Sequence, residues 1–412
     1  MRRFIGLLGA GAALVSLPAL AAPAMAAPPA KDAQRIKIKP LLDARTRFET
    51  VDQGDLDADA LTFRLRGGAE ASLGRFSVMA EGEGTLAADS HYNAFPFPLP
   101  GERQWRPTHA VIADPESLEL NRLQIQYTAG KDAITVGRQR INLDDQRWVG
   151  SVGWRQNEQT FDAARGEVQL GSVMADVTFA IGQRTIFGED AGPRAALEGN
   201  FLFAGLSSKV GTMQGKLFAY LLDYDESFAL ANSSQTWGGI LSGSLPLDGT
   251  RKLNLRASYA RQSDYGTNPF EYATDYWSLE AGSKFAGFDV AAGWEKLGSN
   301  RGRAVQTPMA TLHKFNGWAD LFLITPTAGL EDAYVSLSRK FDGVKVLPGL
   351  HANVTFHQFD SAKGDAEYGT EWDASLGFKL GKVGLLLKYA DYTAESFGVD
   401  TRKLWLQAEW AL

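Results

Sequence analysis

From residue 35 onward, polar and apolar residues alternate along the chain in segments of roughly ten residues. Alternate side chains of a strand point to opposite faces of a sheet, so this spacing predicts strands with one polar and one apolar face. In the segment 61–73 the apolar face holds Phe63, Leu65 and Leu73, and the opposite face holds Arg64 and Glu70. The segments 371–380 and 403–412 repeat the pattern.

The direction in which the apolar face points decides the class of protein. A soluble sandwich also alternates, but it turns its apolar face inward. Here no linker divides the chain, and charges and glycines fill the polar face of strand after strand, as a water-filled lumen requires. A strand-built membrane protein must close into a barrel, because every backbone donor and acceptor needs a partner in hydrocarbon. Aromatic girdles are expected at segment ends, at Tyr127, Tyr259, Trp294, Tyr389, Trp405 and Trp410.

The turns fix the number of strands. A first count gives 19 strand candidates, whereas single-chain bacterial barrels have even numbers. Short connections are expected at 73–75, 129–132, 171–172, 211–213, 248–250, 286–287, 342–348 and 381. Longer ones are expected at 49–60, 88–116, 143–158, 185–199, 226–235, 264–273, 298–330, 361–367 and 394–401.

The two classes alternate strictly if the candidate 313–324 belongs to a long outer loop. Eight short turns and nine long loops then make 17 connections and 18 strands, with both termini in the periplasm. The fold class is therefore all-β: an 18-stranded antiparallel transmembrane β-barrel with short periplasmic turns and long extracellular loops. Such a barrel leaves an aqueous lumen. Loops 88–116 and 298–330 are expected either to fold inward and narrow it or to form a rim above the membrane.

The N-terminal sequence indicates that the protein is exported, and the composition excludes several classes of protein. Arg2 and Arg3, the apolar run 4–17 and Ala24-Met25-Ala26 predict a signal peptide at 1–26. A short periplasmic segment 27–34 and the barrel 35–412 would follow. After the N-terminal segment no run of 18 apolar residues occurs, which excludes a helical membrane protein. The chain has no Cys and a net charge of −6, which removes thiolate metal sites and argues against nucleic-acid binding.

Several long strings carry a family resemblance. They are VGRQRINLDDQRWVG at 136–150, GWRQNEQTFD at 153–162, TPTAGLED at 325–332, HQFDS at 357–361 and YGTEWD at 368–373. These strings resemble the alginate-export family of outer-membrane porins, and the likeness covers roughly 35–412. The resemblance implies an 18-stranded monomeric barrel in the outer membrane. It also implies passive diffusion of an anionic polyuronate through an arginine-lined pore.

Arginines are the candidate cargo contacts, because guanidinium groups bind carboxylates at two points. The parity of a residue, its odd or even position along an alternating strand, predicts the face on which it lies. It places inward the basic Arg64, Arg66, Arg122, Arg165 and Arg256 and the acidic Glu70, Glu81, Glu83, Glu167, Glu280, Asp289 and Glu371. Arg138 and Arg140 share a face with the apolar Ile134 and Val136, so they are expected at the interface or turned inward by a bulge at Gly137. In the alternative reading each arginine pairs with an acidic neighbour and only stiffens the wall.

These patterns favour a diffusion channel for anionic oligo- or polysaccharides or related carboxylated solutes. Its expected partners are outer-membrane lipid, the anionic carbohydrate and periplasmic export components, with no cofactor, metal or nucleic acid. One alternative is a structural or adhesive barrel plugged by its loops. A barrel lipid hydrolase is disfavoured, because His351 and His357 lie about 20 Å apart on one strand and no nucleophile elbow or HExxH pair occurs. The acidic run 52–59 lacks the bidentate Glu that completes a calcium loop.

Overall fold

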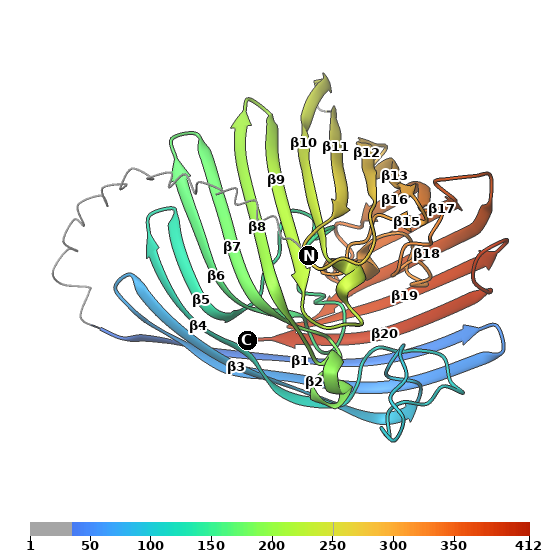
Figure 1. Ribbon diagram of the computed structural model, residues 1–412, viewed down its shortest axis with the longest axis horizontal. Helices are drawn as coiled ribbons and strands as arrows, with labels where there is room; N and C mark the ends of the chain where they lie inside the picture. Colours follow the sequence, from blue (N-terminus) through green and yellow to red (C-terminus); the bar gives the residue numbers. More distant parts are fainter. Residues whose placement is uncertain (1–34, 250) are drawn as a thin grey trace, which may run out of the picture.

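The computed structural model describes residues 35–249 and 251–412. These residues form an 18-stranded antiparallel sheet that closes on itself, because β1 pairs with both β2 and β20. Figure 1 shows the closure, with β20 lying beside β1. The predicted strand number and fold class are confirmed. The predicted signal peptide 1–26 and the segment 27–34 lie outside the described residues.

Consecutive strands of the wall are neighbours, except that β13 pairs with β16 across a long loop. The first nine strands are β1 (Lys37–Gln53), β2 (Leu56–Leu73), β3 (Phe76–His91), β4 (Ser117–Ala129), β5 (Asp132–Gln139), β6 (Thr160–Leu170), β7 (Val173–Arg184), β8 (Ala196–Val210) and β9 (Met213–Tyr224). The others are β10 (Ser234–Asp248), β11 (Arg251–Asp264), β12 (Ala273–Phe285), β13 (Phe288–Leu297), β16 (Leu330–Lys340), β17 (His351–Asp360), β18 (Glu367–Leu380), β19 (Val383–Ala394) and β20 (Thr401–Ala411).

Tight turns close one end of the barrel, as predicted, except that a longer connection, 341–350, joins β16 to β17. Gly171 and Gly381 sit in two-residue hairpins with φ of 62° and 60°, a left-handed conformation that costs glycine little. The segment 313–324 lies in the loop between β13 and β16, as the strand count required. That loop also holds the hairpin β14 (Ser299–Asn300) and β15 (Arg303–Ala304), and the 3-10 helix η3 (Leu312–Lys314). The other short helices are η1 (Glu189–Arg194) and η2 (Leu230–Asn232), both in outer loops.

The long connection predicted at 49–60 is wrong. β1 and β2 stay paired as far as Gln53 and Leu56, so only two residues join them. The reason is packing beyond the membrane: Val51 and Ala58 are buried against Tyr92 and Phe95 of the following loop. A hairpin that buries one face can continue outside the bilayer, and its run of aspartates hid this from sequence reasoning.

The two faces of the wall differ as the alternation predicted. Leu65, Ile125 and Leu217 point outward and expose 56–68 % of their surface, whereas Arg64 and Glu83 point inward and are buried. Tyr259 and Trp277 pack against each other on the outer face in a tilted arrangement, with ring centroids 4.4 Å apart, as expected for a girdle. Trp405 was wrongly assigned to the girdle: it faces inward and is fully buried. Within the described residues no helix is long and apolar enough to cross a membrane.

Candidate functional site

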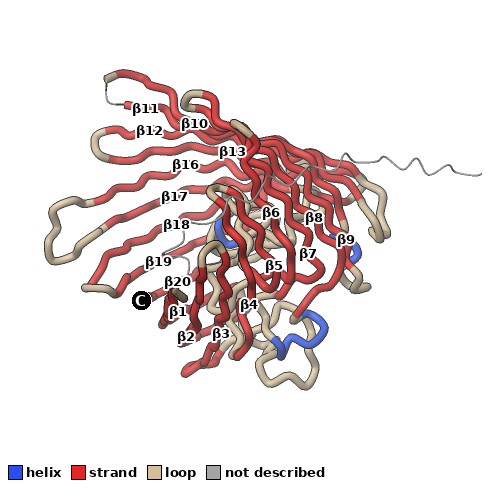
Figure 2. Tube along the Cα trace, turned by 90° about the vertical axis from the view of Figure 1, so that its left-hand side faces the viewer, coloured by secondary structure: helices blue, strands red, loops and turns tan. Residues whose placement is uncertain are grey.

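Loop 140–159, which joins β5 to β6, runs through the lumen and touches distant parts of the wall. Near its start, Asp145 forms an ion pair with Arg256 of β11 at 2.6 Å. Arg147 then reaches β13, where its Nε donates to Glu295 at 2.8 Å. Both loop residues therefore contact strands that are distant from β5 in the sheet. Figure 2 shows loop segments between the two sides of the wall.

The second half of loop 140–159 returns along the opposite wall. Arg45 of β1 donates to the backbone carbonyls of Gly153 and Arg155 at 3.1 and 3.2 Å. Glu158 pairs with Arg66 of β2 at 3.4 Å. The loop is thus held to β11 and β13 on one side of the barrel and to β1 and β2 on the other, and it narrows the lumen between them.

Loop 298–329, which joins β13 to β16, docks on carboxylates of the inner wall. Asn316 donates through Nδ2 to Glu295 at 2.7 Å and to Asp332 at 3.1 Å. The backbone N–H of Ala319 donates to Glu371 of β18 at 2.7 Å. This loop therefore folds inward, which was one of the two arrangements expected for it.

Asp320 joins the two inward loops to the wall. Its carboxylate lies 2.7 Å from Arg155 of loop 140–159 and 3.3 Å from Lys403 of β20. His313, in the same loop as Asp320, lies 2.7 Å away through Nδ1. One buried carboxylate thus holds three basic side chains from three segments of the chain.

An apolar cluster fills the space between these loops and the outer part of the wall. It includes Ile141, Leu143, Trp148 and Val149 of the loop and Phe161, Phe203, Phe218, Tyr220 and Tyr276 of the strands. Burial of this many apolar side chains favours the docked position of the loop. The lumen is therefore not lined by charge throughout, as the alternation alone had indicated.

Loop 92–116 mainly forms the rim, which was the other arrangement expected for it. Its buried side chains pack against the protruding β1–β2 hairpin and against Ala191 of η1. Its end reaches the lumen, where Asp114 pairs with Arg47 of β1 at 3.2 Å.

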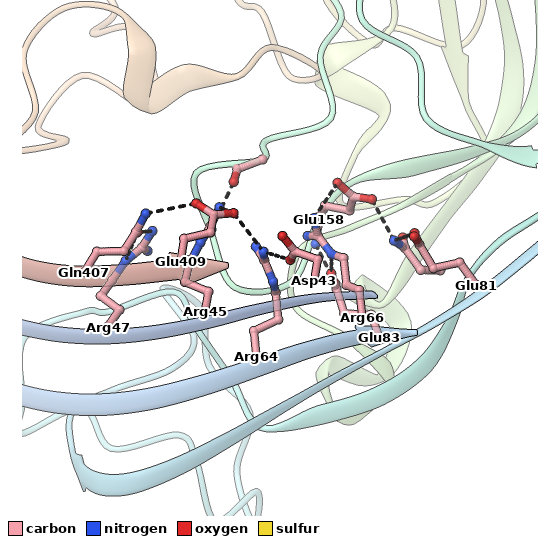
Figure 3. A network of polar contacts seen from close by, with 12 residues as sticks. Asp43, Arg45, Arg47, Arg64, Arg66, Glu81, Glu83, Glu158, Gln407 and Glu409 are labelled. Carbon is pink, nitrogen blue, oxygen red and sulfur yellow. Dashed lines mark hydrogen bonds and ion pairs between the residues drawn. The ribbon is translucent and has the colours of Figure 1, made fainter. Parts of the chain in front are cut away.

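Four arginines form a row on the inner face of β1 and β2: Arg45, Arg47, Arg64 and Arg66 (Figure 3). All four are less than 9 % exposed, because loop 140–159 covers them. Arg45 and Arg64 share Glu409 of β20 at 3.0 and 3.2 Å. Arg64 also pairs with Asp43, and Arg66 pairs with Glu83. Within the described residues, Nε and Nη1 of Arg64 and Nη2 of Arg66 have no hydrogen-bond partner.

The other inward candidates sit on separate strands, each beside a carboxylate. Arg122 of β4 pairs with Glu81 at 2.7 Å. Arg165 of β6 pairs with Asp176 at 2.7 Å and with Glu167 at 3.0 Å. These two sets of pairs are the arrangement that the wall-stiffening alternative described, whereas Arg256 pairs with Asp145 of loop 140–159 and so joins the wall to that loop. Contact with cargo stays a prediction for all of them.

Arg138 and Arg140 separate at the end of β5. Arg138 keeps the outward parity of Val136 and pairs with Asp162 on the outer face at 2.8 Å. Arg140 follows the end of the strand and turns into the lumen, where it pairs with Glu158. The pairing of β5 with β4 and β6 is continuous at Gly137, so no bulge there moves either arginine.

Sequence reasoning missed Arg45, Arg47, Arg147 and Arg155. Arg45 and Arg47 share the inward parity of Asp43 along β1, so extending the alternation to the first strand finds them. Arg147 and Arg155 lie in an irregular loop that has no periodicity to reveal their direction. Their partners are 148 and 165 residues away in the chain.

The buried loop junction perturbs two titratable groups. Burial lowers the pKa of His313 well below its ordinary value, so its ring is neutral. The contacts fit a neutral ring, since Nδ1 donates to Asp320 and Nε2 accepts from Lys388 at 2.6 Å. Burial alone raises the pKa of Asp320, but the contact with His313 and the charges of Lys403 and Arg155 outweigh it and hold the pKa well below its usual range.

Both shifts predict that acid weakens loop docking. The unfolded loop takes up a proton at His313 below about pH 6.5 and at Asp320 below about pH 4, while the docked loop resists both. Docking is thus most stable above pH 6.5 and loses up to about 1.4 kcal/mol per pH unit for each titrating group. Hydrogen exchange of residues 312–320, corrected for intrinsic rates, is expected to be faster at pH 5 than at pH 7.5. Unchanged protection would contradict this, and residues 265–272 serve as the reference loop.

Gly317 is closely packed, so a larger side chain at this position tests whether loop 298–329 is docked. Gly317 has φ of +82°, and an added Cβ would lie 2.3 Å from the carboxylate of Glu371. We expect Gly317→Ala to cost about 1–3 kcal/mol of docking energy and to speed proteolysis within loop 298–329. Gly364→Ala is the matched control, because φ is +92° but the nearest side-chain atom is 4.0 Å away. Equal cleavage rates in the two variants would show that Gly317 is not packed in this way.

The described residues contain no group of three or more His, Asp or Glu side chains that could hold a metal ion.

Solved structures with the same fold are outer-membrane proteins. OccAB4 of Acinetobacter baumannii superposes with a TM-score of 0.72 at 13 % identity, covering 92 % of this chain and 99 % of that one. OpdK of Pseudomonas aeruginosa gives a TM-score of 0.69 at 15 % identity, covering 91 % and 98 %. OpdO of the same organism gives 0.68 at 16 % identity, covering 91 % and 97 %. At these identities the likeness concerns the fold.

The sequence comparison is more specific. No curated protein sequence matches the chain. The family described as "Alginate export" matches residues 42–294, which is more than half of the chain. Together with the closed 18-stranded barrel, this match establishes an outer-membrane channel and not an enzyme. The chain belongs to the alginate-export family.

Proposed function

We propose that this channel carries carboxylated solutes, anionic oligo- or polysaccharides of the alginate type among them, by passive diffusion. The observation that supports this most is a belt of partly exposed cations on the inner wall and at the start of loop 140–159. Arg140, Arg256 and Arg165 expose 30 %, 25 % and 18 % of their side chains, and Arg122 and Lys216 expose 14 % and 12 %.

Each of these cations already holds a protein carboxylate, which favours exchange over tight capture. A cargo carboxylate can replace Asp176 at Arg165 or Asp145 at Arg256, and the displaced aspartate, which is partly exposed, is then left to water. Conduction requires binding that is weak and spread over several sites. Because the belt is nearly balanced in charge, we expect weak anion selectivity. One relative of the same fold, OpdK, has been solved with vanillate, itself a carboxylate.

Planar-bilayer recording tests the proposal. We expect discrete conductance steps, a reversal potential that favours chloride modestly over potassium, and block by oligouronates but not by neutral oligosaccharides of equal length. Arg165→Gln combined with Arg256→Gln is expected to weaken the block about tenfold, as the loss of one or two charge-assisted contacts would. Arg251→Gln, at an exposed turn, is the control. Equal block by the neutral oligomer, or cation selectivity, would refute carboxylate transport.

The contacts between the two inward loops also fit a second candidate function, that of a structural or adhesive barrel with a plugged lumen. Its supporting observation is the apolar cluster that joins loop 140–159 to the wall. Electrical silence of correctly folded protein would favour this reading.

A further inference from the structure

The outer face of the wall carries a ring of ion pairs next to the aromatic girdle. Three of its members are one-to-one pairs between neighbouring strands: Arg261–Asp275 at 3.0 Å, Lys296–Glu331 at 2.6 Å and Arg402–Asp391 at 3.3 Å. Each lies towards the long-loop end of its strands and shares the parity of outward aromatic or apolar residues such as Trp277 and Leu406. The ring therefore marks the outer limit of the apolar band, where lipid headgroups lie.

The fourth member of the ring is not balanced. Asp162 of β6 accepts from Arg138 of β5 at 2.8 and 3.2 Å and from Arg184 of β7 at 3.2 Å. Two guanidinium groups thus share one carboxylate, so the outer face of this cluster carries more positive than negative charge. The charge of Glu119 of β4 attracts both guanidinium groups, but Glu119 has the lumen parity, between the outward Leu118 and Leu120, and so acts from the inner side of the wall. Arg184 keeps 38 % of its side chain exposed, so part of this charge faces outward.

A lane of small residues runs from this cluster towards the middle of the membrane. Below Asp162, the outward positions of β6 are Ala164 and Gly166, and a Cβ added at Gly166 would meet no atom within 4 Å. The residues paired with Ala164 and Gly166 are large: Val136 and Ile134 on β5, and Phe179 and Val177 on β7. All four are exposed by 46–54 %.

We propose that this surface is a lipid-binding site, in which Arg138 and Arg184 hold a phosphate of an outer-leaflet lipid. One acyl chain of that lipid lies along Ala164 and Gly166, between the larger side chains of β5 and β7. Guanidinium groups match phosphate in charge and in two-point geometry, and excess basic charge at a membrane surface attracts anionic headgroups. The site lies outside the barrel, so it is independent of the cargo that the lumen carries.

Native mass spectrometry of the full channel tests this, using diphosphorylated lipid A and its dephosphorylated form as probes. Arg184→Gln leaves the Arg138–Asp162 pair intact and makes this cluster as balanced as the rest of the ring. We expect wild-type protein to retain the phosphorylated lipid about fivefold better than the Arg184→Gln variant. The control Arg261→Gln, at a balanced pair, is expected to behave as wild type.

The folds of both variants are checked by their thermal unfolding in detergent. Equal retention of the two lipid forms by wild-type protein would overturn the proposal. So would equal loss of lipid in both variants, since it would mean that any ring arginine serves. Displacement of the lipid by an equal concentration of inorganic phosphate would also overturn it, because the site would then be a simple anion site.

Discussion

Replacing residues 142–157 with a three-residue glycine-serine linker is expected to raise the single-channel conductance roughly two- to fivefold. The segment crosses the lumen, from Asp145 at β11 and Arg147 at β13 to Arg155, whose backbone carbonyl accepts from Arg45 of β1. An 18-stranded wall without it encloses a wider aqueous path. The barrel is expected to survive, because Gln139 and Phe161 at the two ends of the loop are paired neighbours.

The control for this deletion is a change of similar kind on the rim. Residues 98–101 form the tip of loop 92–116, outside the lumen, where only Leu99 of the four is half-buried, against the rim cluster. Replacing them with two glycines is expected to leave the conductance unchanged. A conductance that stays the same after the loop 142–157 replacement would mean that another segment sets the narrowest point.

The second large effect is expected from Asp320→Ala. The carboxylate of Asp320 is nearly fully buried and holds Arg155, Lys403 and His313. Its removal leaves buried charges without compensation, which typically costs about 3–5 kcal/mol. Because the loops, and not the strands, depend on this contact, the loss should appear as loop undocking and not as unfolding of the barrel.

Two measurements report that undocking. Hydrogen exchange in residues 312–320 is expected to rise by at least a hundredfold, and channel records should show frequent transitions to a larger conductance. Asp365→Asn, in an exposed outer loop, is the control and should change neither. If Asp320→Ala keeps full protection of residues 312–320, the ion pairs do not hold the loop.

Sequence reasoning succeeded for the wall because strand periodicity and turn chemistry are local. The hairpin glycines and the two-residue alternation fixed 18 strands, and the even-number rule removed segment 313–324 from the wall. It failed where non-local packing decides. The β1–β2 hairpin continues past residue 49 because loop 92–116 covers it, and aspartates at its tip concealed the strand.

Prediction from the sequence was limited in the same way for the lumen. Parity placed Arg64 and Arg66 on the inner face, but it could not show that loop 140–159 buries them. Trp405 illustrates the reverse error, because an aromatic residue near a strand end was taken for a girdle residue against its own inward parity. The direction of a strand residue follows from its neighbours, whereas its covering depends on loops whose contacts span more than a hundred residues.

A transmembrane channel requires apolar side chains of the wall to face lipid and polar ones to face water, and β4 gives the most direct test. The chain has no Cys, so single cysteines at positions 123, 124, 125 and 126 can each carry a spin label in reconstituted bilayers. We predict high oxygen accessibility at 123 and 125, where Leu and Ile are 48 % and 56 % exposed on the outer face, and high accessibility to a water-soluble relaxation agent at 124 and 126. Water accessibility at 123 and 125 with oxygen accessibility at 124 and 126, or no alternation at all, would contradict the transmembrane channel.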